Sequence, residues 1–243
     1  MAFPFGEHLP RLARHHYQAH AVIHWQCAVE GRATGWLGEV FHARFRELLL
    51  HAAIRESLLC PVYCLMPDHF HVIWMGLRRD TDQRNGMKFL REFINQEFEC
   101  SWNRGNGCNP GDCCRSQETS AESTNQVLKR YSSQCKRPPM KPWRLQKQAY
   151  DRILRPEERR RGAFQANCDY IRLNPVRARF VTRDEHWPFG GSVVPGYPDL
   201  HPASQESWEI FWRVYVERRG AEPPMSSDEK PQLFEGQGAP WLC

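Results

Sequence analysis

The order of hydrophobic patterns along this chain predicts an α+β fold, a sandwich in which an antiparallel sheet is packed on one face by helices. Three observations support the prediction. Residues 20–29 alternate between apolar and polar positions, apolar stripes at helical spacing occupy residues 39–52 and 89–98, and two hydrophobic runs flank Pro67-Asp68. Together with the patterns that follow, they indicate strand, helix, two strands, helix, helix and strand in chain order.

The first half of the chain contains the clearest elements. Ile23, Trp25 and Cys27 share one face of the segment 20–29, which indicates a half-buried strand. The stripe that begins near Glu39 is a core-facing helix surface that needs no cofactor to explain it. Asp80-Thr81-Asp82 offers side chains that cap a helix, so the second helix is expected to begin there.

The second half has one long polar stretch and then ordered elements. Residues 104–139 are rich in Gly, Ser, Asn, Gln and Pro and lack apolar periodicity, which predicts a mobile insertion. Arg155-Pro156-Glu157-Glu158 is typical of a helix start, with proline in the first turn followed by acidic residues. The helix is expected to end at Asn174-Pro175, because the residue before a proline disfavours the α region.

The buried side of this last helix is predicted to be the stripe of Phe164, Cys168 and Ile171. Residues 176–181 are expected to form a further strand. We predict one domain over residues 1–195, interrupted by the insertion, and a tail over residues 196–243 that contains one short helix.

Composition narrows the class of protein. The chain has 243 residues, a formal net charge of +5 and ten cysteines, and it lacks a signal-peptide pattern and any apolar run long enough to span a membrane. We therefore expect a cytoplasmic protein with reduced thiols and no membrane partner. Residues 141–183 contain twelve Lys or Arg against four Asp or Glu. This local excess fits either a nucleic-acid backbone or a solvated helix face.

The segment Met66-Pro67-Asp68-His69-Phe70-His71-Val72-Ile73-Trp74 carries the first candidate site. Residues two apart on a strand project to the same face, so His69 and His71 are expected to lie side by side. Imidazole is the commonest metal ligand in proteins. The pattern fits a metal-binding pair, and it equally fits two polar positions on a partly buried strand.

A second candidate site lies a hundred residues later. Tyr170 and Asn174 are one helical turn apart, on a face roughly 100° from the predicted buried stripe. This placement fits functional side chains. It also fits a tyrosine at the margin of the core and an asparagine that forms a turn before proline.

Taken together, the segments 66–74 and Tyr170-Ile171-Arg172-Leu173-Asn174-Pro175-Val176-Arg177-Ala178 resemble the REP-associated tyrosine transposases, which belong to the His-hydrophobe-His nuclease superfamily. The runs Tyr150-Asp151-Arg152-Ile153-Leu154-Arg155 and Trp187-Pro188-Phe189 are also similar to that family. The likeness covers residues 15–100 and 143–192. Arg179 departs from the pattern, because a glycine is usual at that position.

The resemblance implies a ferredoxin-like catalytic domain that cuts and rejoins single-stranded DNA beside palindromic, REP-like hairpins. By motif position, Tyr170 is the nucleophile, which would form a 5′-phosphotyrosine, and His69, His71 and Asn174 hold a divalent metal. Mixed nitrogen and oxygen ligands suit Mg²⁺ or Mn²⁺. Asp68 is either a further ligand or a turn residue after Pro67.

Alternatives to this interpretation remain open. Tyr131 and Tyr150 are rival nucleophiles. Two alternative functions are a non-catalytic nucleic-acid-binding protein on the same fold and a metallohydrolase that uses a water nucleophile. The sequence leaves both a monomer and a dimer open and slightly favours the monomer. The residues predicted to contact DNA are basic: Lys88, Arg91, Arg152, Arg155, Arg159, Arg160, Arg161, Arg172 and Arg177.

Overall fold

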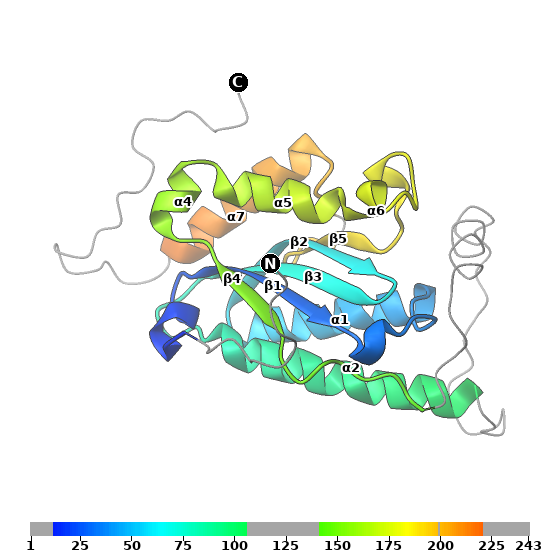
Figure 1. Ribbon diagram of the computed structural model, residues 1–243. Coiled ribbons are helices and arrows are strands. Elements are labelled where there is room, and N and C mark those ends of the chain that lie inside the picture. The colour runs from blue at the N-terminus through cyan, green and yellow to red at the C-terminus, as the bar shows by residue number, and fades with distance from the viewer. Residues whose placement is uncertain (1–11, 106–140, 199, 221–243) are drawn as a thin grey trace, which may run out of the picture.

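A computed structural model describes residues 12–105, 141–198 and 200–220. Five antiparallel strands form one sheet in the order β4-β1-β3-β2-β5. Helices α1 and α2 cover one face of the sheet, and α5 lies over the other face together with α7 (Figure 1). The α+β prediction is confirmed, with α1 and α2 as the predicted helical layer. The expectation that helices cover only one face is wrong, because α5 and α7 form a second layer on the other face.

The strands are β1 (Val22–Ala28), β2 (Leu58–Met66), β3 (His69–Gly76), β4 (Tyr150–Ile153) and β5 (Gly190–Val193). The helices are α1 (Glu39–Arg55), α2 (Gln83–Gly105), α4 (Pro156–Arg160), α5 (Ala163–Arg172), α6 (Asn174–Arg177) and α7 (Gln205–Gly220). Short 3₁₀ turns occupy η1 (Arg14–Tyr17), η2 (Glu30–Arg32) and η3 (Asp184–His186). No helix in the described part of the chain is both long and apolar enough to cross a membrane.

The two hydrophobic runs around Pro67-Asp68 form the β2–β3 hairpin at the centre of the sheet. In its register Met66 lies opposite His69, and Cys64 lies opposite His71. Strand β1 pairs on the other side of β3, where Gln26 lies opposite His71. The histidine pair is therefore enclosed by paired strands on both sides, and its side chains leave the sheet on the face toward α5.

Packing of α1 and α2 explains the apolar stripes read from the sequence. Phe41 of α1 stacks on Phe98 of α2 with ring centroids 5.3 Å apart. The indole Nε1–H of Trp25 donates to Gln83 Oε1 at 3.1 Å, which satisfies a polar group in an otherwise apolar layer. Asp82 caps α2 as predicted, because its Oδ1 accepts a hydrogen bond from the backbone of Arg84 at 3.0 Å.

Two predictions for the second half of the chain are wrong. Residues 176–181 do not form a strand, because α6 and the turn after it occupy them. Pro175 sits in the first turn of α6, where its fixed φ favours a helix, and its carbonyl accepts a hydrogen bond from the backbone of Phe180 at 2.9 Å. The single helix expected from Pro156 onward is broken at Gly162, which adopts a φ of +83°.

Strands β4 and β5 were not predicted, and both are short strands at the two edges of the sheet. The insertion expected at residues 104–139 lies almost entirely outside the described residues, since α2 extends to Gly105. The predicted tail helix is present as α7. It packs on α5, where the ring of Phe164 lies 5.4 Å from Trp212 and 6.1 Å from Trp208, centroid to centroid.

Candidate active site

The predicted histidine pair forms a close contact on β3. His69 Nε2 and His71 Nε2 lie 3.0 Å apart. His71 is 1% exposed, whereas His69 at the start of the strand is partly exposed. The pair therefore has one buried member and one that faces the edge of the site.

Asp68 orients the more exposed histidine. Its Oδ1 lies 2.6 Å from His69 Nδ1, and its Oδ2 lies 2.9 Å from Arg32 Nε. Burial alone would raise the pKa of the Asp68 carboxyl, but the hydrogen bond from His69 and the charge of Arg32 outweigh it and keep that pKa below its usual value. Asp68 is thus an ionised acceptor for the Nδ1–H of His69, and this contact leaves Nε2 on the side of the ring that faces His71.

A third histidine, His24 of β1, belongs to this cluster and was not predicted. His24 Nε2 lies 2.9 Å from His71 Nδ1. Burial is the main cause that lowers the pKa of His24 to about 4 and that of His71 to about 2, so both imidazoles are neutral at pH 7. The signal available in the sequence was a polar residue between Ile23 and Trp25, on the opposite face of an amphipathic strand.

Helix α5 brings Tyr170 over these histidines. The centroid of its ring lies 5.8 Å from that of His71 and 6.1 Å from that of His24. The side chain is 44% exposed, so a ligand from solvent can reach it. Arg177 lies over the same ring, with its guanidinium carbon 4.3 Å from the centroid, and it donates a hydrogen bond to the Tyr170 carbonyl oxygen.

Asn174 is the first residue of α6, one turn beyond Tyr170, and α6 packs on β2. The side-chain Nδ2 of Asn174 is buried and lacks a hydrogen-bond partner among the described residues. The left-handed turn after this helix falls on Arg179, with a φ of +60°. A glycine adopts this conformation without steric cost, which explains why the family pattern has glycine there.

The donor set fits a divalent cation. Two metal–nitrogen bonds of about 2.1 Å at a right angle place their nitrogens about 3.0 Å apart, which matches the separation of 3.0 Å between the two Nε2 atoms. The buried Nδ2 position of Asn174 has no partner among the described residues, and exchange of the two amide ends would place an oxygen there. Among the described residues no three His, Cys, Asp or Glu side chains form a metal cluster, so the remaining ligands would be an amide oxygen and water.

The predicted DNA-contacting residues fall into separate groups. Lys88 and Arg91 are on α2, beneath the opposite face of the sheet (Figure 1), and Arg91 donates to the carbonyl of Lys147 at 2.8 Å. Arg159 is partly buried against α7, beside Tyr215. Two others form ion pairs, Arg152 with Glu158 at 3.4 Å and Arg160 with Glu157 at 3.7 Å. Arg155 and Arg161 are exposed.

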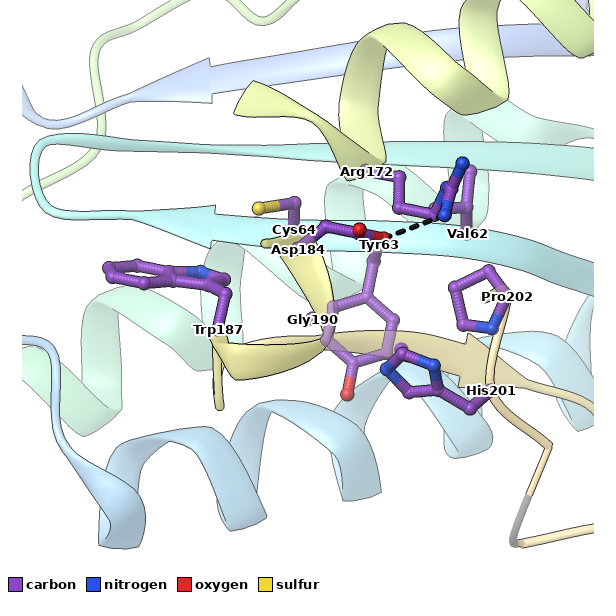
Figure 2. Close-up of a pocket in the computed structure, with 10 residues that line it drawn as sticks. Val62, Tyr63, Cys64, Arg172, Asp184, Trp187, Gly190, His201 and Pro202 are labelled. Atoms are coloured by element: carbon purple, nitrogen blue, oxygen red, sulfur yellow. Dashed lines mark hydrogen bonds and ion pairs between the residues drawn. The ribbon is translucent and has the colours of Figure 1, made fainter. Parts of the chain in front are cut away.

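Arg172 is held in a hollow between β2, β5 and the segment around Asp184. Its guanidinium bonds Asp184 at 2.7 Å, as Figure 2 shows, and it also pairs with Asp169 at 3.3 Å. Tyr63, Gly190, His201 and Pro202 line the same hollow. These contacts anchor the end of α5 next to Tyr170, so Arg172 has a structural task beside any contact with DNA.

The rival tyrosines differ in placement. Tyr150 is 53% exposed on edge strand β4, where it lies opposite Gln26, which in turn lies opposite His71. It is thus two strands away from β3, about 10 Å, whereas Tyr170 is in ring contact with His71. Tyr131 lies outside the described residues.

The fold defines an α+β domain whose first four strands follow the ferredoxin-like order, with β5 added at the β2 edge. No family model and no curated protein matches the chain. Among solved structures, the chain is similar to a REP-associated tyrosine transposase bound to a REP hairpin. The TM-score is 0.50 at 14% sequence identity, over 76% of this chain and 82% of the other. At this identity the likeness establishes a shared fold.

Proposed function

We propose that this protein is a metal-dependent transposase or nuclease of single-stranded DNA, with Tyr170 as its nucleophile. The observation that carries the proposal is the contact between the exposed ring of Tyr170 and His71, whose Nε2 lies 3.0 Å from that of His69. A tyrosine and two histidines thus lie together on one face of the sheet, which supports the proposed roles of nucleophile and cation-binding pair. The solved transposase of similar fold, which was bound to a REP hairpin, supports DNA with a hairpin as the partner.

The proposed chemistry assigns each step to a residue of the chain. A bound Mg²⁺ or Mn²⁺ would supply Lewis-acid stabilisation of charge on the scissile phosphate, and His69, His71 and Asn174 would hold it. The Tyr170 oxygen forms a bond to phosphorus while the bond to the 3′ oxygen breaks. The phenolic proton is given up to solvent and the 3′ oxygen gains one, which leaves a 5′-phosphotyrosine and a free 3′-hydroxyl. Attack by a 3′-hydroxyl reverses the step and joins strands.

Positioning follows from the packing. Arg177 covers one side of the Tyr170 ring and holds the carbonyl of the same residue, so the phenol is presented by a fixed helix end. Arg152 lies on β4 opposite His24, on the face that carries the histidines, and its side chain is 47% exposed. We propose that Arg152 and Arg177 bind phosphates on either side of the cleaved bond.

The test uses labelled single-stranded hairpin oligonucleotides with Mn²⁺ or Mg²⁺, including repeats from the DNA that flanks the gene, and a denaturing protein gel. We expect a protein-linked label with wild type and with Tyr150→Phe, which removes another exposed tyrosine, and none with Tyr170→Phe or His69→Ala/His71→Ala. Cleavage that survives Tyr170→Phe without an adduct would identify a metallohydrolase instead. Binding without cleavage of the whole pool would identify a non-catalytic DNA-binding protein.

A further inference from the structure

The buried histidine of the pair has both ring nitrogens engaged. His71 Nε2 faces His69 Nε2 at 3.0 Å, and His71 Nδ1 faces His24 Nε2 at 2.9 Å. A neutral imidazole carries one N–H, which sits on either Nδ1 or Nε2, and only the nitrogen without it can bind a metal. The ability of His71 to act as a ligand therefore depends on where that one hydrogen sits.

The hydrogen-bond pattern on α5 decides this question. The side-chain amide of Asn167 donates to the carbonyl of Ala163 at 2.7 Å, one turn earlier on the helix. The amide nitrogen is thereby assigned, and Asn167 Oδ1 is left to accept the hydrogen bond that joins this side chain to His24. Exchange of the two amide ends would set two oxygens against each other at Ala163.

The orientation of the Asn167 amide fixes which ring nitrogen carries the hydrogen in His24 and then in His71. His24 donates to Asn167 through Nδ1–H, so its Nε2 carries the lone pair. That lone pair accepts the Nδ1–H of His71, which leaves Nε2 of His71 free. On the other side Asp68, held by Arg32, accepts the Nδ1–H of His69. The Nε2 atoms of both histidines then face the same space.

We infer that His24 and Asn167 are positioning residues that hold His71 as its Nδ1–H tautomer and so keep its Nε2 available to a metal ion. The inference rests on the metal site of the proposed function. It also links that site to the nucleophile, because Asn167 lies one turn before Tyr170 on α5. The helix that presents the tyrosine thus sets the tautomer of the buried ligand.

The first measurement needs no variant and no metal. In wild-type protein with ¹⁵N-labelled histidine and EDTA, long-range ¹H–¹⁵N correlation spectra at pH 7.5 report which ring nitrogen carries the hydrogen. We expect Nδ1–H for both His71 and His24. An Nε2–H tautomer at His71 would overturn the inference, whatever the protein does with DNA.

The second measurement compares variants by Mn²⁺ binding, followed from the free-ion electron paramagnetic resonance signal. His24→Leu removes the acceptor, and second-shell losses of this kind weaken metal binding about 10- to 100-fold. His24→Gln retains an acceptor oxygen and is expected to restore most of the affinity. His42→Leu is the matched control, because it removes a partly buried imidazole on α1, under the opposite sheet face.

The two proposals fail in different ways. Wild type that binds no Mn²⁺ would refute the metal site of the proposed function, and the tautomer spectra would still decide the role of His24. Wild type that binds Mn²⁺ with an affinity unchanged in His24→Leu would refute the positioning role alone.

Discussion

Acidification is expected to destabilise this protein through its buried neutral histidines. Burial is the largest cause that lowers the pKa of both His24 and His42 to about 4, whereas a histidine in an unfolded chain has a pKa of about 6.5. Below pH 6.5 the unfolded state therefore binds protons that the folded state does not accept. The free energy of unfolding is at its full value above pH 6.5 and falls as the pH drops toward 4.

The size of the effect follows from these values. Between pH 7 and pH 5 each histidine whose pKa falls from about 6.5 to about 4 costs roughly 2 kcal/mol of stability. His24 and His42 together give about 4 kcal/mol, and His71 acts in the same direction. Carboxyl groups titrate mainly below this window, at about pH 4, so the histidines dominate the change. The loss is a large fraction of a typical stability of about 5–15 kcal/mol.

Urea unfolding followed by tryptophan fluorescence, with EDTA present, measures this change at pH 7 and pH 5. His42→Gln isolates one contribution, because His42 lies outside the candidate site and its Nε2 lies 2.8 Å from the hydroxyl oxygen of Tyr63. Glutamine offers an acceptor there but does not titrate. The loss of stability between the two pH values should be smaller by about 2 kcal/mol in this variant. An unchanged pH dependence would show that His42 is not held neutral by burial.

Two further predictions concern the packing that supports the sheet. A Cβ added at Gly76 would lie 1.8 Å from the carbonyl oxygen of Ala19, so Gly76→Ser should lower the free energy of unfolding by about 3 kcal/mol or more. Gly38→Ser is the control. A Cβ added at Gly38, at the start of α1, meets nothing within 4 Å, so this variant should be neutral or stabilising. Equal urea midpoints for the two would contradict the close approach. Gln83 is fully buried and accepts a hydrogen bond from Trp25 Nε1. Gln83→Leu leaves that buried donor without a partner and should lower the free energy of unfolding by about 2–4 kcal/mol in the same assay. A midpoint equal to that of wild type would mean that another group accepts the indole hydrogen.

The histidine cluster is part of both the packed core and the candidate metal site. The buried imidazoles of His24 and His71 fit a core because their ring nitrogens have hydrogen-bond partners. The Nε2 atoms of His69 and His71 lie 3.0 Å apart, close enough for both to bind one cation. A cation that binds this pair in the folded state is expected to stabilise the fold.

Local pattern in the sequence was sufficient for the elements that have strong periodicity. The strand at 20–29, the helices from Glu39 and Asp82, and the hairpin around Pro67-Asp68 follow from apolar spacing, because each buries one face against the same core. His69 and His71 were placed side by side by the two-residue repeat of a strand. Tyr170 lies off the apolar stripe of its helix, and the resemblance of its segment to a known family's motif singled it out as the predicted nucleophile.

Only the tertiary structure decided what surrounds these side chains. Edge strands β4 and β5 have four residues each, too few for periodicity, and they form because paired neighbours offer them hydrogen bonds. His24, Asn167 and Arg32 come from three separate elements and meet the pair through strand register and helix packing, which no local pattern encodes. Candidate reactive residues can be read from motifs, whereas the hydrogen bonds around them depend on contacts between distant segments.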